Sequence, residues 1–126
     1  MTDTKQEIAV DVRPSYLEQE SEPLEQRFVF AYRVRIANHT KEPVRLLLRH
    51  WRITDGEGSV REIDGMGVVG EQPLIAQNDE FSYTSGAVLK TSVGYMEGHY
   101  VMRTNSDKEI KVAIPRFRLE QPNALN

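Results

Sequence analysis

The sequence predicts an all-β protein, an antiparallel β-sandwich of about seven strands or more. Three observations support this fold class. Apolar and polar residues alternate along most of the chain, which is the two-residue period of a strand with one buried face. Turn-forming clusters such as "NHTKEP" and "TNSDKE" interrupt the alternation about every 8–12 residues. No segment shows a helical period longer than about two turns.

The first three expected strands differ in how many faces they bury. In "IAVDVR" (8–13), isoleucine and valine share one face, while aspartate and arginine share the other. In "RFVFAYRVRIAN" (27–38), five apolar side chains lie opposite Arg33 and Arg35. The segment "VRLLLRHWRIT" (44–54) is apolar on both faces, which predicts a central strand that is covered on both sides over part of its length.

The remaining expected strands are shorter or irregular. They are "SVREI" (59–63), "EFSYTSG" (80–86), "AVLKT" (87–91), "GYMEGHYVMRT" (94–104) and "EIKVAIPRFRLE" (109–120). We expect the "YTSG" end of the second of these to turn away from the sheet. In the last segment the alternation slips by one residue at Pro115. Proline cannot donate to a strand ladder, so this slip predicts an edge position, a bulge or a change of strand.

Length and composition limit the class of protein. The 126 residues predict one domain, spanning 1–126, and the formal charge of −3 argues against nucleic-acid binding through bulk positive charge. The chain has no cysteine, which excludes disulfides and thiolate metal sites and leaves a fibronectin type III-like (immunoglobulin-like) sandwich. It shows neither a signal-peptide pattern nor an apolar run of about 20 residues, so we expect a cytoplasmic protein without a membrane span.

The segment "IDGMGVVGEQP" contains Gly65, Gly67 and Gly70 in the order G-x-G-x-x-G. In dinucleotide-binding folds this pattern opens a helix that holds a pyrophosphate, and an acidic residue follows about 20 positions later. Here no helix pattern and no such acidic residue follow. We expect the glycines to permit positive φ angles and a close chain crossing. The alternative is a nest of amides that contacts an anion or a nucleotide pyrophosphate.

Other candidate chemistry is sparse. Glu97 and His99 are two residues apart and share a strand face, so they could supply half of a weak Mg²⁺ or Co²⁺ site, although an ordinary strand histidine is the expected role. No G-x-S-x-G elbow or other catalytic pattern is present, and we expect a protein that is not an enzyme. Two consecutive expected strands carry five arginines. If they shared a surface, it would suit an acidic partner, but we expect salt bridges with glutamates instead. They are Arg33, Arg35, Arg45, Arg49 and Arg52.

Several motifs together resemble the ApaG family. They are "FVFAYRVRIAN", "LLRHWRITDGEG", "GMGVVGEQPLI", "FSYTSGAVLKT", "GYMEGHYVM" and "IPRFRLEQPNALN". The resemblance extends from about residue 8 to residue 126 and implies a fibronectin type III-like sandwich. It also implies an association with cobalt resistance and magnesium efflux in bacteria, and a role as an interaction module in larger eukaryotic proteins. It implies no catalytic residue, and it marks Gly65, Gly67 and Gly70 as a proposed pyrophosphate contact.

These observations lead to two main functional hypotheses, and a third, with the least support, is a direct metal carrier that uses Glu97 and His99. The first is a non-enzymatic sandwich that binds an unknown protein partner in divalent-cation (Co²⁺/Mg²⁺) homeostasis. It predicts an exposed apolar patch, or a self-complementary sheet edge that forms a homodimer. The alternative is a small-molecule binder, in which the Gly65–Gly70 loop contacts a nucleotide polyphosphate with or without Mg²⁺. Neither of the two main hypotheses requires an established cofactor or a nucleic-acid partner.

Overall fold

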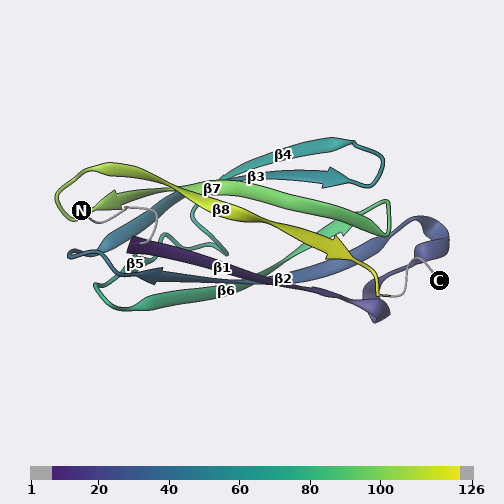
Figure 1. Cartoon of the computed structure of the whole chain (residues 1–126), viewed down its shortest axis with the longest axis horizontal. Coiled ribbons are helices and arrows are strands. Elements are labelled where there is room, and N and C mark those ends of the chain that lie inside the picture. Colours follow the sequence, from purple (N-terminus) through teal and green to yellow (C-terminus); the bar gives the residue numbers. More distant parts are fainter. Residues whose placement is uncertain (1–6, 123–126) are drawn as a thin grey trace.

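The computed structural model describes residues 7–122, which form two antiparallel β-sheets packed face to face (Figure 1). These residues contain eight strands: β1 (Ile8–Tyr16), β2 (Phe28–Asn38), β3 (Val44–Asp55), β4 (Val60–Met66), β5 (Leu74–Ile75), β6 (Glu80–Leu89), β7 (Val93–Thr104) and β8 (Glu109–Glu120). Two 3-10 turns, η1 (Glu18–Glu20) and η2 (Pro23–Glu25), lie between β1 and β2. None of the helical segments within residues 7–122 is long and apolar enough to cross a membrane.

The strand order confirms the predicted all-β sandwich. One sheet has the order β1-β2-β6, and the other has the order β4-β3-β7-β8, with the short β5 also paired to β3. All pairings are antiparallel. The central position predicted for the 44–54 segment is confirmed, because β3 has β4 and β5 on one side and β7 on the other. The predicted coverage of both faces is wrong, because Arg45, Leu48 and Arg52 are exposed. A β-bulge between Leu46 and Leu48 shifts the alternation, so that apolar residues in both phases reach the same core. This two-sheet arrangement fits a fibronectin type III-like sandwich.

One strand boundary predicted from the sequence is wrong. The segments "EFSYTSG" and "AVLKT" do not separate at a turn, because β6 runs without interruption from Glu80 to Leu89. Gly86 continues the ladder opposite Ala31. An added Cβ at Gly86 would lie 3.3 Å from the carbonyl oxygen of Phe30, so the glycine allows a close approach to β2 rather than a turn.

The alternating apolar residues of both sheets meet in one core. An aromatic cluster joins the two sheets, with Tyr32 from β2, Trp51 from β3 and Phe117 from β8. Ring centroids in this cluster are 5.3–5.8 Å apart, which is within the range favoured by aromatic pairs. The side chain of Trp51 is buried with 3% exposure, so the only tryptophan in the chain anchors the core.

The slip at Pro115 is a β-bulge on an edge strand, as the sequence predicted. In the β7–β8 ladder, Met96 pairs with Phe117 and Gly98 pairs with Ile114. Two residues of β8, Pro115 and Arg116, therefore lie opposite a single residue of β7. The bulge shifts the alternation so that Phe117 returns to the core.

A buried asparagine fixes the turn between β2 and β3. Asn38 is fully buried, and its Nδ2 donates hydrogen bonds to the carbonyl oxygens of Glu42 and Ile75, each at 2.9 Å. Its Oδ1 accepts hydrogen bonds from the backbone amide and the hydroxyl of Thr40. One polar side chain therefore ties the turn to β5, and this satisfies its own hydrogen-bonding capacity inside the core.

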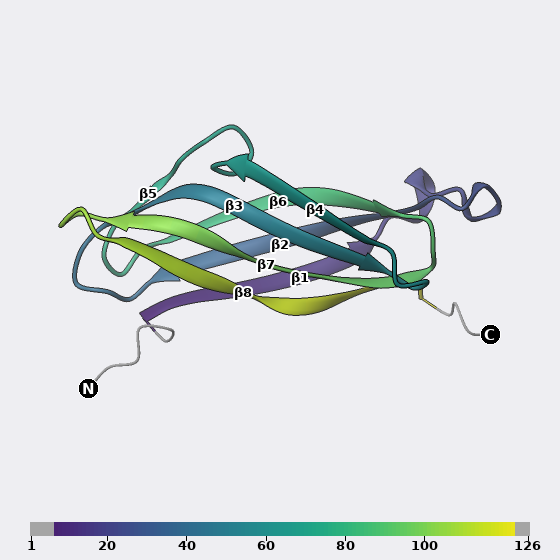
Figure 2. The same cartoon turned by 90° about the horizontal axis from the view of Figure 1, so that it is seen from above.

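The sandwich has two lateral sides with different closures. On one side the edge strands β1 and β8 run next to each other in the same direction (Figures 1 and 2), and no ladder joins them. On the opposite side β6 faces the β3–β4 part of the larger sheet. There Nη2 of Arg61 donates to the carbonyl oxygen of Val88 at 2.9 Å. The glycine-rich connection after β4 covers the rest of this side, next to β2 and β6.

Candidate functional site

The glycine segment, residues 65–71, forms a tight hairpin turn. Gly67 and Gly70 have φ angles of 61° and 81°, and Val69 has a φ of 43°. Val68 and Glu71 exchange backbone hydrogen bonds of 2.8 and 2.9 Å. Positive φ at both central residues, here Val69 and Gly70, is typical of a type I′ turn. The positive φ angles expected from the sequence are therefore present at two of the three glycines.

Gly67 also marks the close chain crossing. An added Cβ at this position would lie 2.0 Å from the carbonyl oxygen of Glu71. The amide of Gly67 donates to the carbonyl oxygen of Leu47 at 2.8 Å, so this amide and those of Val68 and Glu71 already have main-chain acceptors. The segment leads into no helix. Anion or pyrophosphate contact by Gly65, Gly67 and Gly70 stays a prediction.

The first glycine of the motif makes room for an arginine. Gly65 lies in β4 directly opposite Arg49 of β3, and an added Cβ would lie 2.5 Å from Arg49 Cζ. The Arg49 Nη1 passes this point and donates to the carbonyl oxygens of Met66 and Gly67, at 3.1 and 2.8 Å. Among residues 7–122, no carboxylate lies within ion-pair distance of this half-buried guanidinium.

Arg49 lines a pocket of about 300 Å³ between the two sheets. Its walls come from β2, β3, β6 and the glycine segment: Tyr32, Arg49, Trp51, Met66, Val68, Val69, Gly70, Tyr83 and Ser85. The hydroxyls of Tyr83 and Tyr100 are hydrogen-bonded to each other in the core beside it. Burial raises the pKa of Tyr32, Tyr83 and Tyr100, while the nearby charge of Arg49 opposes this rise. The three hydroxyls therefore lose their protons only at a higher pH than an exposed tyrosine does.

The structure places His99 beside another histidine. The rings of His50 and His99 stack on the outer face of the larger sheet, with centroids 5.1 Å apart. Nδ1 of His50 lies 2.5 Å from Asp64 Oδ1, and its Nε2 lies 3.1 Å from Glu62 Oε1. The hydrogen bond to Asp64 is the main cause that raises the pKa of His50. Desolvation is the main cause that lowers the pKa of His99.

Glu97, the other half of the proposed metal pair, makes an ion pair of 3.5 Å with Arg116. In the described part of the chain, no three His, Asp or Glu side chains form a cluster that could hold a metal ion. A weak Mg²⁺ or Co²⁺ site on Glu97 and His99 stays a prediction. Sequence reasoning missed the His50–Asp64 contact, because only the β3–β4 register brings these two residues together.

The five arginines do not share a surface, because β2 and β3 belong to different sheets. Arg33 and Arg35 lie on the outer face of the three-stranded sheet, where Arg35 is 3.9 Å from Glu80. Arg49 faces inward, whereas Arg45 is exposed and donates to the carbonyl oxygen of Gln72. A single cationic patch on these strands is therefore excluded.

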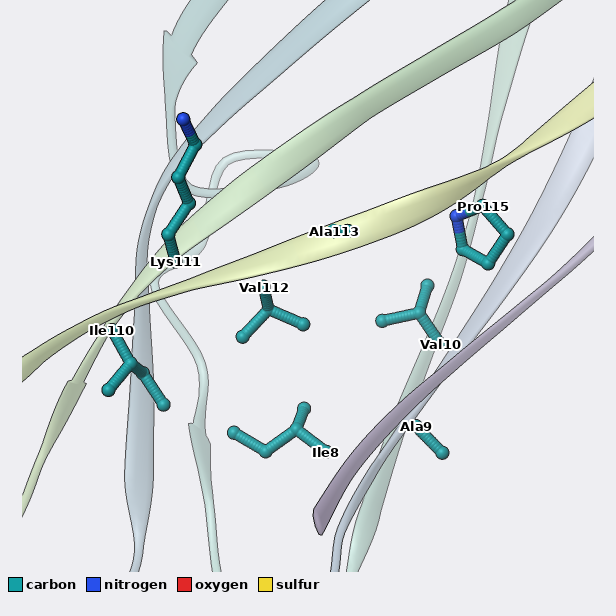
Figure 3. Close-up of a pocket in the computed structure, with 8 residues that line it drawn as sticks. All are labelled: Ile8, Ala9, Val10, Ile110, Lys111, Val112, Ala113 and Pro115. Carbon is teal, nitrogen blue, oxygen red and sulfur yellow. The ribbon is translucent and has the colours of Figure 1, made fainter. Parts of the chain in front are cut away.

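An apolar groove of about 650 Å³ runs between the edge strands β1 and β8. Ile8 and Val10 of β1 and Ile110 and Val112 of β8 point into it, while Lys111 extends away on the other face of β8 (Figure 3). The two contributing pairs are each spaced by two residues, as expected for strands that turn one face to a common space. Ile8 is itself buried, and Val10, Ile110 and Val112 are partly buried against the core, so the groove is the edge of the core rather than the exposed apolar patch that the interaction hypothesis predicts.

Comparisons with known proteins agree with this architecture. A family model described as "ApaG domain" matches residues 18–104. The chain is 47% identical to Protein ApaG of Proteus mirabilis over 98% of both chains. It is 49% identical to Protein ApaG of Pseudomonas aeruginosa over 100% of both chains. A crystal structure of a protein assigned as ApaA from Bordetella pertussis superposes with a TM-score of 0.90, at 44% identity, over 93% of this chain and 95% of that chain.

Proposed function

The chain belongs to the ApaG family, and from this premise we propose that it is a non-enzymatic module whose β1–β8 groove binds an extended segment of a partner protein. The observation that carries this proposal is the groove itself. It is apolar, it is elongated along two strands, and its walls are the unpaired edges of both sheets. Unpaired strand edges offer main-chain hydrogen bonds, and pockets beside them accept every second side chain of an extended peptide.

We propose a segment of another protein as the occupant. The chain segments outside the described residues read "MTDTKQ" before β1 and "NALN" after β8. Neither contains apolar side chains at alternating positions, so neither matches Ile8, Val10, Ile110 and Val112. An extended partner segment with apolar side chains at every second position matches them. We propose that residues 1–126 act as one such module.

The family resemblance supplies the physiological setting. We propose that the module works in the cytoplasm, in Co²⁺ and Mg²⁺ homeostasis, and that it acts there through its partner rather than through a resident metal ion. This setting rests on the resemblance alone. The groove would then be the surface through which a cation-handling protein is recognised.

The test compares variants inside and outside the groove. Val112→Glu places a charge in the groove, and Val88→Glu places the same charge on the outer face of β6, where Val88 is 38% exposed. Proteins retained from a bacterial lysate on immobilised wild type and on both variants would be compared by mass spectrometry. We expect at least one protein to bind the wild type and Val88→Glu but not Val112→Glu. If Val112→Glu does not fold, Val112→Thr, which keeps the side-chain volume, replaces it in the comparison.

A second measurement identifies the bound segment. An alternating apolar peptide from the retained protein should shift the backbone amide signals of β1 and β8 in an NMR titration. The proposal would be contradicted if the Val112 variants retained the same proteins as the wild type. It would also be contradicted if the peptide changed amide signals only in strands other than β1 and β8. A concentration-dependent dimer abolished by Val112→Glu would overturn it as well, because the occupant would then be a second copy of this chain.

A second candidate function is a small-molecule binder that contacts nucleotide pyrophosphate through the Gly65–Gly70 loop. The observation that favours it is the guanidinium of Arg49, which is held against this loop without a carboxylate partner in residues 7–122. An amide NMR titration with ATP and diadenosine tetraphosphate, with and without Mg²⁺, tests it. Saturable shifts at Gly65, Gly67 and Gly70 would support it, and unchanged spectra at millimolar ligand would contradict it.

A further inference from the structure

We propose that the pocket beneath the glycine segment is a site for one phosphoryl-type oxyanion, bound by the side chains of Arg49, Tyr32 and Ser85. The inference rests on the second candidate function and narrows it to a single anionic group and three named ligands. It is independent of the β1–β8 groove, which lies on the opposite lateral side of the sandwich. Binding by these side chains also differs from binding by the loop amides, and the two can be tested separately.

The first step of the argument is the charge of Arg49. A guanidinium carries five N–H donors, and in the described chain only Nη1 makes hydrogen bonds, both to main-chain carbonyls. A half-buried cation without an opposite charge is unfavourable, and carbonyl oxygens compensate for it only in part. An oxyanion within reach of Nε and Nη2 would supply both the missing acceptors and the missing charge.

The second step is the set of hydroxyl groups that line the same pocket. Tyr32 and Ser85 are Cα partners in the β2–β6 ladder, and both line the pocket with Arg49. Burial raises the pKa of Tyr32, and a side-chain hydrogen bond with Ser85 opposes this rise, so a bound anion would replace that bond with hydrogen bonds from both hydroxyls. The hydroxyl of Tyr83 is already paired with that of Tyr100 and holds the inner wall in place. One guanidinium and two hydroxyl donors are the groups that oxyanions accept hydrogen bonds from.

The third step is size. A volume of about 300 Å³ is at the lower limit of ordinary small-molecule pockets. It admits one phosphoryl group rather than a whole nucleotide. Gly70 lies at the mouth, and an added Cβ there would meet no atom within 4 Å, so the remainder of a larger ligand could extend past it into solvent. The pocket therefore fits the terminal group of a polyphosphate as well as free phosphate.

Trp51 provides a direct measurement, because it is the only tryptophan and it lines the pocket. Its fluorescence would be followed during titration with inorganic phosphate, pyrophosphate and ATP at constant ionic strength, with chloride as the control anion. We expect a saturable change with at least one phosphate compound and none with chloride. Saturation by inorganic phosphate assigns the site to the free ion, and saturation by pyrophosphate and ATP alone assigns it to the end of a polyphosphate.

Three variants separate the side chains from the loop. Loss of a charged hydrogen-bond partner should weaken binding by about tenfold or more in Arg49→Met. Arg52→Met removes an exposed arginine from the same strand and should leave binding unchanged. Arg49→Lys keeps the charge but loses the planar fork, so it should bind phosphate with an affinity between those of the wild type and Arg49→Met. It serves as the test variant if Arg49→Met fails to fold.

Two outcomes would overturn the inference. One is the absence of a saturable, phosphate-specific signal, which would leave the groove proposal intact. The other is full binding by folded Arg49→Met together with lost binding by Gly70→Asn. That pattern would place the anion on the loop amides. It would support the second candidate function and contradict the proposed binding by Arg49, Tyr32 and Ser85.

Discussion

The guanidinium of Arg49 occupies the space in which a side chain at Gly65 would otherwise stand, 2.5 Å from the ideal Cβ position. The two residues are direct partners in the β3–β4 ladder. The first glycine of the G-x-G-x-x-G motif is therefore explained by an arginine on the neighbouring strand, which reaches past it to the carbonyl oxygens of Met66 and Gly67.

This relationship predicts different costs for two alanine substitutions. Gly65→Ala should displace only the flexible end of Arg49 and lower the free energy of unfolding by about 1 kcal/mol. Gly67→Ala should cost about 3 kcal/mol or more, because its Cβ would meet the main-chain oxygen of Glu71 at 2.0 Å and its φ is 61°. Urea unfolding of both variants checks the order. A larger loss in Gly65→Ala than in Gly67→Ala would contradict the assignment.

The hydroxyl pair of Tyr83 and Tyr100 predicts a non-additive effect on stability. Tyr100→Phe leaves the buried hydroxyl of Tyr83 without its partner and should lower the free energy of unfolding by about 1–2 kcal/mol. The double variant, with phenylalanine at both positions, removes both hydroxyls and should recover most of that loss. A double-mutant cycle measured in urea gives the coupling. Simple additivity of the two single variants would show that the pair does not act as a unit.

The same tyrosines predict a loss of stability at high pH. Burial raises the pKa of both above the ordinary value of about 10, so the folded chain keeps these protons while the unfolded chain loses them. The unfolded state binds fewer protons above that pH, and the free energy of unfolding must fall as the pH rises. Thermal melts from pH 8 to 11 measure the slope, and it should be shallower when both tyrosines are replaced by phenylalanine.

The stacked histidines should titrate in opposite directions from the ordinary histidine pKa. The hydrogen bond to Asp64 raises the pKa of His50, and desolvation lowers that of His99. The stabilising contribution of His50 is thus present below its unfolded pKa of about 6.5 and is lost as the pH rises through its folded pKa. Ring-proton NMR should show His50 titrating at the higher pH. Asp64→Asn should lower that pKa, whereas Asp11→Asn on the other sheet should leave it unchanged.

The buried polar group of Asn38 predicts a large effect from a substitution that keeps the branching of the side chain and removes its polar atoms. Asn38→Leu removes two donor contacts to main-chain carbonyls and the acceptor of Thr40, and it should cost about 3 kcal/mol of unfolding free energy. Asn78→Gly is the matched control, because Asn78 is exposed and has a φ of 62°, which glycine adopts more easily. A near-neutral Asn38→Leu would contradict the role assigned to its hydrogen bonds.

Most strands were predictable from the sequence because they carry a two-residue period, and the shift in that period at Pro115 predicted the bulge. The two-residue β5 was not predicted, because Leu74 and Ile75 are too few to show a period. The continuity of β6 was not predictable in this way. A glycine in a strand has two readings, a turn or a close approach, and only the position of Phe30 on β2 decides between them. Local pattern is therefore sufficient for strand position but not for strand end.

The candidate site depended on pairings that no local pattern encodes. Strand alternation places Arg49 and Arg52 on opposite faces, but it does not show that Arg49 lies opposite Gly65 or beside Tyr32 and Ser85. The partners of Arg49 lie on β2, β4 and β6, which the chain brings together only after it crosses between the sheets. The same crossing separated Arg33 and Arg35 from the β3 arginines. The G-x-G-x-x-G motif locates the glycine segment in the sequence. The pocket beneath it, which Arg49 lines, is evident only from the pairing of the strands.

The parallel course of β1 and β8 has a mechanical consequence. β1 begins at one end of the long axis, and β8 ends at the other (Figure 1). Tension applied at Ile8 and Glu120 would therefore pull each strand along its own length. The β1–β2 and β7–β8 ladders would be loaded in shear, with many hydrogen bonds bearing the force at once instead of opening one after another. A domain linked at both ends within a larger assembly would thus resist extension better than its lack of disulfides suggests.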